Sequence, residues 1–175
     1  RIYIHNRFSH TLAKAHYYLF LLAGIGIVIA YLFGQFEGRE YLEFPAVFLI
    51  PVFIGWLLFA INLYSSVSFK KDPMPVYIWM WLVGAIFMII TLAEANLWRL
   101  PHFGDNVIRD ITVQWKANGA LVGCWNMFVY GTATYLITQL SKDKSTATST
   151  LTYFLFFLGF TNLLFNWGHH VYPLP

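Results

Sequence analysis

Charged residues are scarce in this chain of 175 residues, since Asp, Glu, Lys and Arg together make up only 11% of it. Soluble domains contain about a quarter, so the composition excludes an ordinary water-soluble protein. The few basic residues form no stripe and no recognition motif, which excludes nucleic acid as a partner. The single cysteine, Cys124, cannot form an internal disulfide, and we interpret it as a small buried residue.

The chain contains long apolar runs instead, with 58% hydrophobic and 20% aromatic residues. Five runs are long enough to cross a bilayer as helices, which satisfy their backbone polar groups internally. They lie at residues 12–33, 46–64, 76–97, 117–140 and 149–167. We therefore expect an all-α fold: an integral membrane bundle of five transmembrane helices, a single domain of residues 1–175 surrounded by membrane lipid.

Three local features refine this expectation. Pro51 lies inside the second run and predicts either a kink there or a free carbonyl that a neighbouring group satisfies. Between the third and fourth runs, residues 106–114 predict a short surface helix, and we interpret His102 as a solvated residue at the membrane surface. The basic N-terminus has no small-residue cleavage site and is unlike a signal peptide. The abrupt ends, Arg1 and Pro175, are compatible with one piece of a larger or split protein.

Basic residues between the runs predict the orientation of the helices. One side carries seven: Arg1, Arg7, Lys14, Lys70, Lys71, Lys142 and Lys144. The other side carries four: Arg39, Arg99, Arg109 and Lys116. Because basic residues concentrate on the cytoplasmic side, we expect the N-terminus in the cytoplasm and the end of the fifth run near the outer face.

The connection between the first two runs, residues 36–45, concentrates charge in a chain that otherwise has little. It contains Glu37, Arg39, Glu40 and Glu43. One interpretation is a solvated turn. In the other, Glu40 and Glu43 bind calcium or accept protons through their oxygens, and the Arg39 guanidinium binds a carboxylate. The predicted topology puts this connection on the same side as the end of the fifth run, which favours the second interpretation.

The fourth run carries two amides on one helix face, because Asn118, Val122 and Asn126 recur every four residues. In one interpretation these amides form hydrogen bonds across helices. In the other, Asn118 projects into a cavity that it shares with the histidines at the end of the chain.

Two adjacent histidines, His169 and His170, follow the fifth run. Polar groups in hydrocarbon need partners or a metal, and neutral imidazole suits copper, iron or zinc. Adjacent helical residues point about 100° apart, so both rings can bind one metal only where the helix is distorted or ends, and Pro173 favours an ending. Alternatively, the rings anchor the chain at the membrane interface.

Three motifs, in this order and with similar spacing, resemble the heme-copper oxidase superfamily: Gly38 to Pro45, Val122 to Trp125, and Gly168 to Tyr172. The likeness is greatest to the catalytic subunit of nitric oxide reductases. The C-family terminal oxidases come next, with an opening similar to the residues 113–115. The resemblance covers nearly the whole chain, as the third to seventh helices of a larger subunit.

The resemblance implies a heme iron that faces a second metal, copper in oxidases and non-heme iron in nitric oxide reductases. His169 and His170 would bind the second metal. Arg39 and Glu40 would lie near the propionates of a heme b and a calcium ion, and Glu43 would take up protons from the outer side. The resemblance also implies the inner membrane of a bacterium, other subunits of a respiratory complex, and a cytochrome c or quinol as electron donor.

The chain departs from the family at the second metal. The third histidine of the family is replaced by Asn118 in the reductase alignment or by Gly119 in the oxidase alignment. Val122 and Asn126 replace two glutamates of the reductase. Two imidazoles and at best a neutral amide bind a divalent ion less tightly. The heme-ligating helices of the family are not among the five runs, so if the chain is complete, other chains supply the hemes or there are none. No Cys-x-x-Cys-His motif occurs, so any covalent heme belongs to a partner.

We therefore expect a membrane-bound respiratory redox protein that is an enzyme only together with further helices or partner chains. It would be part of a nitric oxide reductase-like catalytic subunit whose second-metal site, with Asn118 in it, is altered, in the manner of a nitric oxide dismutase. One alternative is a portion of a C-family terminal oxidase that reduces oxygen. The other is a non-catalytic, degenerate subunit that stabilises a respiratory complex.

Overall fold

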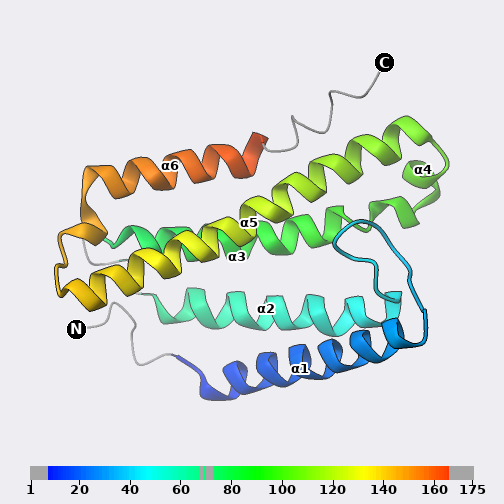
Figure 1. The fold of residues 1–175 in the computed structure, drawn as a ribbon, viewed down its shortest axis with the longest axis horizontal. Helices are drawn as coiled ribbons and strands as arrows, with labels where there is room; N and C mark the ends of the chain where they lie inside the picture. The colour runs from blue at the N-terminus through cyan, green and yellow to red at the C-terminus, as the bar shows by residue number, and fades with distance from the viewer. Residues whose placement is uncertain (1–7, 68, 70–72, 166–175) are drawn as a thin grey trace. The chain divides into compact units, whose positions relative to one another are not determined.

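The computed structural model describes residues 8–67, 69 and 73–165. All regular secondary structure in these residues is helical, as Figure 1 shows. The chain divides into two compact units, Ile2–Val67 and Ser68–Pro175. The all-α prediction is confirmed for the described part of the chain.

The first unit is an antiparallel pair of helices, α1 (His10–Leu32) and α2 (Leu49–Ser66), which lie side by side (Figure 1). The Ser9 hydroxyl caps α1 by accepting a hydrogen bond from the Leu12 amide at 3.2 Å. The Asn62 side chain of α2 accepts from the Ser9 amide at 2.8 Å and donates to the Ser9 carbonyl at 3.0 Å. The buried amide of Asn62 thus satisfies two backbone groups at the end of α1.

Aromatic side chains fill the contact between α1 and α2. The His16 ring lies 5.3 Å from the rings of Phe20 and Phe59, and Phe20 meets Trp56 edge to face at 5.4 Å. Gly55 permits this packing, because a Cβ added there would lie 3.0 Å from the Phe20 ring. Close approach at a glycine is an ordinary way for membrane helices to pack.

Pro51 lies in the first turn of α2 and not deep inside the helix. A one-turn 3-10 helix, η1 (Ala46–Phe48), precedes α2, and the α-helix begins at Leu49. Amide hydrogens of the first helical turn have no partner within the helix, so a proline there removes no hydrogen bond.

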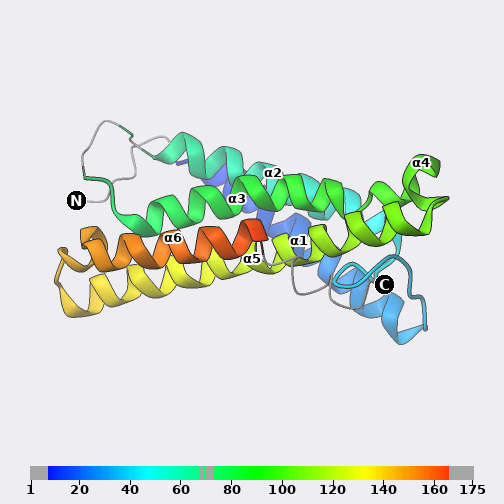
Figure 2. The same ribbon diagram turned by 90° about the horizontal axis from the view of Figure 1, so that it is seen from above.

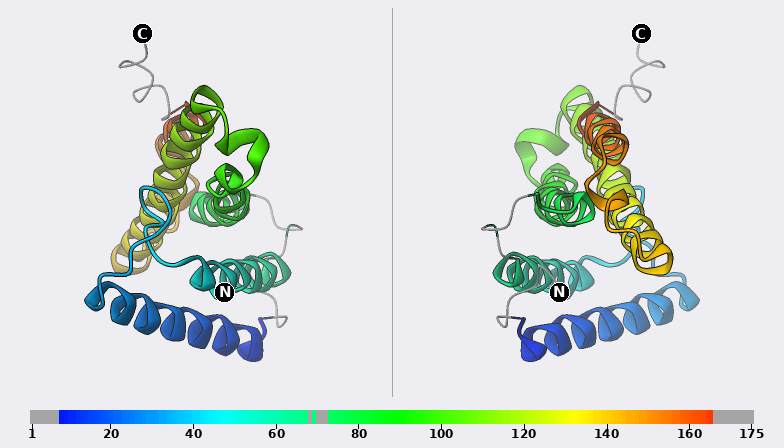
Figure 3. Two further views of the ribbon diagram at one scale, coloured as in Figure 1. Left: turned by 90° about the vertical axis from the view of Figure 1, so that its right-hand side faces the viewer. Right: turned by 90° about the vertical axis from the view of Figure 1, so that its left-hand side faces the viewer.

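The second unit contains three long helices, α3 (Val76–Glu94), α5 (Val107–Ser141) and α6 (Thr150–Phe165). A short helix, α4 (Pro101–Gly104), connects α3 to α5 together with the 3-10 helix η2 (Leu97–Arg99). Figure 2 shows α6 running back along α5, and the end views of Figure 3 show α3 and α6 against different sides of α5. Helix α5 is therefore the centre of this unit.

Small residues bring α3 and α5 together. A Cβ added to Gly84 would lie 3.1 Å from the Met127 Cβ, and one added to Gly131 would lie 2.8 Å from the Trp81 ring. Met80 and Leu121 are almost completely buried in this unit. The glycines thus allow backbone approach while large apolar side chains fill the space around them.

Helix α5 begins at Val107, ten residues before the predicted start of the fourth span. The separate surface helix predicted for residues 106–114 is wrong, because this segment forms the first turns of α5 itself. Asn106 caps it by accepting from the Arg109 amide at 3.1 Å, and no proline or glycine interrupts the helix before Gly119. A helix of 35 residues is about 52 Å long, well beyond a hydrocarbon core of about 30 Å.

His102, in α4, is exposed, as the sequence predicted. Its carbonyl accepts a hydrogen bond from Nη1 of Arg109 at 3.2 Å, and the same guanidinium nitrogen lies 3.3 Å from the Nδ1 of the ring. This contact ties the connection to the first turn of α5.

Four helices in the described residues are long and apolar enough to cross a membrane: His10–Leu32, Ala46–Ser66, Val76–Arg99 and Val107–Ser141. They indicate a multi-pass membrane protein. The fifth predicted span is represented by α6, which has 16 described residues and a length of about 24 Å. Residues 166 and 167 of that predicted span lie outside the described residues, so the count of five remains a prediction.

Candidate functional site: polar contacts between apolar helices

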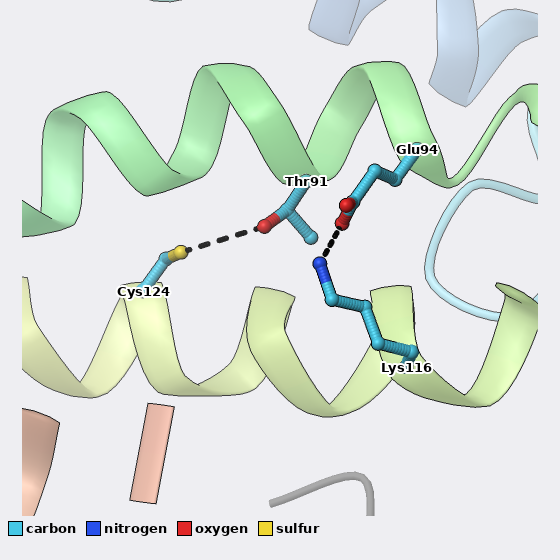
Figure 4. Close-up of polar contacts among 4 residues, drawn as sticks. All are labelled: Thr91, Glu94, Lys116 and Cys124. Carbon is cyan, nitrogen blue, oxygen red and sulfur yellow. Dashed lines mark hydrogen bonds and ion pairs between the residues drawn. The ribbon is translucent and has the colours of Figure 1, made fainter. Parts of the chain in front are cut away.

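An ion pair joins the two central helices of the second unit. The Lys116 ammonium of α5 contacts the Glu94 carboxylate at the end of α3, as Figure 4 shows. The side chains of Lys116 and Glu94 are 43% and 28% exposed. Ionisable groups in membrane helices are costly and usually paired, so this pair is the first candidate for a functional contact.

A second polar contact lies along the same pair of helices (Figure 4). The Thr91 hydroxyl is 4.0 Å from the Cys124 sulfur, and both residues are fully buried. The interpretation of Cys124 as a small buried residue is confirmed. A buried thiol with a hydroxyl neighbour in an apolar contact behaves as a packing residue with a weak hydrogen bond.

Asn118, the predicted catalytic amide, is buried with 1% of its surface exposed. Its Oδ1 accepts a hydrogen bond from the Gln114 Nε2 at 2.9 Å, one helical turn earlier. Asn126, on the same predicted face, is half-buried. The Gln114 bond satisfies one lone pair of the amide and orients Asn118 within its own helix.

The register between α5 and α6 is set by two glycines. A Cβ added to Gly123 would lie 2.5 Å from the Leu163 Cα, and one added to Gly159 would lie 2.7 Å from the Met127 Cε. Gly123 is therefore opposite Leu163, and Met127 is opposite Gly159. Because the numbering of antiparallel helices runs in opposite directions, Phe165 at the described end of α6 is level with about Leu121.

This register distinguishes Asn118 from Gly119, the two positions at which the resemblance could place the missing third histidine. Successive helical residues are rotated by about 100°. Asn118, five residues before Gly123, lies about 140° around α5 from the side that meets α6, whereas Gly119 lies about 40° from it. Of the two positions, Gly119 is thus the one on the α6 side of the helix.

In the first unit, the charged connection between α1 and α2 is a compact turn held by its own carboxylates. The Glu43 carboxylate accepts a hydrogen bond from the Tyr41 amide at 3.1 Å, and the Glu43 backbone carbonyl accepts one from the Glu37 amide at 2.7 Å. The Glu37 carboxylate accepts from the Ala46 amide at 2.8 Å, at the start of η1. Gly38 has a φ of +85° and Tyr41 a φ of +69°, so the turn uses left-handed backbone at two positions.

The predicted cofactor-binding residues lie within this turn. Arg39 is half-buried, and its carbonyl accepts from the Leu42 amide at 2.8 Å, while Glu40 and Glu43 are exposed. The turn thus brings Arg39, Glu40 and Glu43 into one short segment, as the sequence implied. Two of its three carboxylates already accept backbone amides, which is the behaviour of a structural turn.

The predicted metal ligands His169 and His170 lie outside the described residues. In the part of the chain that is described, no three His, Cys, Asp or Glu side chains gather in a way that could hold a metal ion. Glu37, Glu40 and Glu43 are included in this finding. Calcium, the second metal and heme therefore stay predictions made from the sequence.

Sequence reasoning missed the ion pair between α3 and α5. The signal was present, because Glu94 lies inside the predicted span 76–97 and Lys116 directly precedes the span 117–140. A carboxylate inside an apolar run predicts a partner. Which basic residue would meet it depended on the packing of α3 against α5.

Comparisons of the chain with known protein families, with curated proteins and with solved structures found no match. The class that the fold and composition define is a helical membrane protein with at least four helices able to span a bilayer among the described residues.

Proposed function

We propose that this chain is part of the catalytic subunit of a membrane-bound respiratory enzyme of the heme-copper oxidase type. In this proposal the subunit is nitric oxide reductase-like and has an altered second-metal site, of reductase or dismutase kind. It lies in the inner membrane of a bacterium with its N-terminus in the cytoplasm, and receives electrons from a cytochrome c or quinol.

The observation that carries the proposal is the register of α5 and α6. The described part of α6 ends level with Leu121, and His169 and His170 follow Phe165 by four and five residues. Such a stretch reaches between about 6 Å as a helix and about 17 Å as an extended chain. Gly119 is two residues, about 3 Å of helix, from Leu121. The length of chain between Phe165 and the histidines is therefore compatible with a site beside the α5 segment that holds the third ligand in the family.

The residues of this chain supply an incomplete ligand set, and we assign no chemical step to them. Two imidazoles with at best a neutral amide suit a borderline metal such as copper or iron but leave its charge uncompensated. In the proposal, hemes are held by other helices or chains. Arg39 and Glu40 act near the propionates, and Glu43 takes up protons. The Asn118 amide lies beside the reaction site only in the reductase alignment, because it is turned about 140° from the side of α5 that meets α6.

A C-family terminal oxidase portion is the second candidate, and one observation favours it. The oxidase alignment puts the missing histidine at Gly119, and the reductase alignment puts it at Asn118. Gly119 lies on the α6 side of α5 and Asn118 does not. The helix geometry thus supports the oxidase alignment at this position.

Metal analysis of the complex isolated in mild detergent tests the role of the histidines. The double variant His169→Ala/His170→Ala should lose the second metal and keep its heme difference spectrum. The control His102→Ala, which removes an exposed imidazole from α4, should retain both. Unchanged metal content in the double variant would overturn the assignment, and a complex without heme would leave only the non-catalytic subunit.

Restoring a third imidazole distinguishes the two alignments. Gly119→His should raise the affinity for the second metal if the oxidase alignment holds, and Asn118→His should do so if the reductase alignment holds. Thermal melting of both variants verifies that they are folded. Nitric oxide and oxygen consumption, measured on the same preparation, then separate reductase, oxidase and dismutase activity.

A further inference from the structure

An open apolar groove lies between α5 and α6 in the second unit. Its volume is about 390 Å³, which is within the range of about 300–1,000 Å³ for small-molecule sites. Its main lining residues are Thr134, Ile137, Leu151, Phe154, Leu155 and Leu158. Leu151 and Phe154 are 76% and 56% exposed, so the groove opens to the outside of this unit.

The hydroxyl groups at the loop end of the groove form hydrogen bonds with other groups of the protein. The Thr152 hydroxyl donates to the Thr146 carbonyl at 2.6 Å and lies 2.8 Å from the Ser149 hydroxyl. Both Thr146 and Thr152 line the groove. Because these polar atoms are satisfied internally, the groove presents methyl groups and apolar side chains to an occupant.

Two lysines flank this end of the groove. Lys142 ends α5 in the left-handed conformation, with a φ of +58°, and Lys144 follows in the connection. Both are exposed, and neither forms an ion pair with a described residue. Lys144 is two residues from Thr146, which lines the groove, so the backbone of Lys144 lies near the loop end of the groove.

Asp143, between the two lysines, forms no ion pair with either in the described residues, and the three residues together carry a net charge of +1. Its carboxylate accepts from the Ser145 amide at 2.9 Å, from the Ser145 hydroxyl at 2.7 Å and from the Thr146 hydroxyl at 3.3 Å. The Asp143 carboxylate therefore forms its hydrogen bonds within its own turn. The loop presents two ammonium groups outward at the end of a membrane-crossing helix, where lipid headgroups lie.

We propose that the groove binds one acyl chain of an anionic phospholipid whose phosphate is held by Lys142 and Lys144. The combination of an apolar groove with a net cationic end matches such a lipid, because an anionic phospholipid brings an apolar chain and a negative phosphate together. The predicted orientation adds support, because it places this loop on the cytoplasmic side, where anionic lipids are enriched.

Spin-labelled lipids test the site in vesicles that contain the intact protein. Phosphatidylglycerol and phosphatidylcholine with a labelled acyl chain are compared by the fraction of label that the protein immobilises. An attraction of about 1 kcal/mol per lysine corresponds to about a fivefold preference for the anionic lipid per charge. Lys142→Gln/Lys144→Gln should reduce this preference several-fold, and Lys14→Gln, at an exposed lysine of α1, should reduce it much less.

Filling the groove tests the acyl chain separately from the headgroup. Thr134→Phe should reduce the immobilised fraction of both lipids, whereas Val129→Phe, at an exposed position of α5 outside the groove, should not. Circular dichroism verifies that each variant is folded. The proposal is overturned if the wild type shows no anionic preference, if the lysine variant keeps it, or if Thr134→Phe has no effect. Crosslinking of Leu158 to another polypeptide would also overturn it, since a helix would then occupy the groove.

Discussion

Replacing Gly123 by alanine should destabilise the contact between α5 and α6. The new Cβ would lie 2.5 Å from the Leu163 Cα and 2.8 Å from the Leu163 Cβ, whereas ordinary contacts begin at 3.4 Å. The nearest atom belongs to the backbone of α6 and cannot rotate away. Helix α6 would therefore have to retreat by about 0.9 Å at this point.

Two glycine variants isolate the cost of this collision. Gly24→Ala adds a Cβ with nothing within 4 Å. Gly159→Ala meets only the flexible end of Met127 at 2.7 Å, with its next neighbour at 3.5 Å. All three changes gain a similar helix propensity of up to about 1 kcal/mol, which cancels in the comparison.

Overpacking a core contact costs about 1–3 kcal/mol, so Gly123→Ala should be less stable than Gly24→Ala by that amount. At about 2–4 °C per kcal/mol for a chain of this size, the apparent melting temperatures in detergent should differ by about 2–12 °C. Gly159→Ala should fall close to Gly24→Ala. If Gly123→Ala melts together with both controls, the register of α5 and α6 described here is wrong.

Three further predictions concern polar contacts. Asn62→Ala removes both side-chain bonds to Ser9 and should cost about 1–3 kcal/mol, measured by chemical unfolding and by faster amide exchange at Ser9. Hydrogen bonds from its own turn hold the pKa of Asp143 below the ordinary value. The stabilisation of the loop by these bonds is therefore complete above about pH 4 and is lost as the pH falls through the lowered pKa. Protection of the loop from protease should decrease over the same pH range, and Asp143→Ala should remove this pH dependence. The coupling energy of Glu94 and Lys116, from a double-mutant cycle with Gln at each position, should be no more than about 1 kcal/mol, because both side chains are partly exposed.

Each of these three predictions would be contradicted by a specific measurement. Unchanged exchange at Ser9 in the Asn62 variant would mean that the end of α1 is held by other groups. A loop that becomes more protected as the pH falls would contradict the sign of the Asp143 effect. A coupling energy of several kcal/mol would show that the Glu94 pair is enclosed in a dry environment by a further partner.

Much of the secondary structure could be predicted because it depends on local composition. Apolar runs predicted α1, α2 and α3 to within a few residues, since a segment in hydrocarbon must satisfy its backbone internally and the helix does so within one run. The predicted start of the fourth span was wrong as the start of α5, because residues 106–114 were interpreted as a separate surface helix. Hydropathy marks where a helix leaves the membrane and not where the helix ends.

The candidate site was predicted less well. The turn that contains Arg39, Glu40 and Glu43 could be found from its charge density. The hydrogen bond from the Tyr41 amide to the Glu43 carboxylate could not be predicted, because it depends on left-handed backbone within the turn. The sequence left Asn118 and Gly119 equivalent as replacements for a histidine. Only the side of α5 that meets α6 distinguishes them.

By itself the sequence determined that this is an apolar, helical, membrane-type chain, and it identified the paired histidines and the charged turn as the places to look for chemistry. The tertiary structure alone decided which faces meet. The pairing of Glu94 with Lys116, the opposition of Gly123 to Leu163 and the groove between α5 and α6 all depend on the rotation and register of one helix against another. Helix formation is a property of neighbours along the chain, whereas rotation and register are selected by contacts between residues 20 or more positions apart.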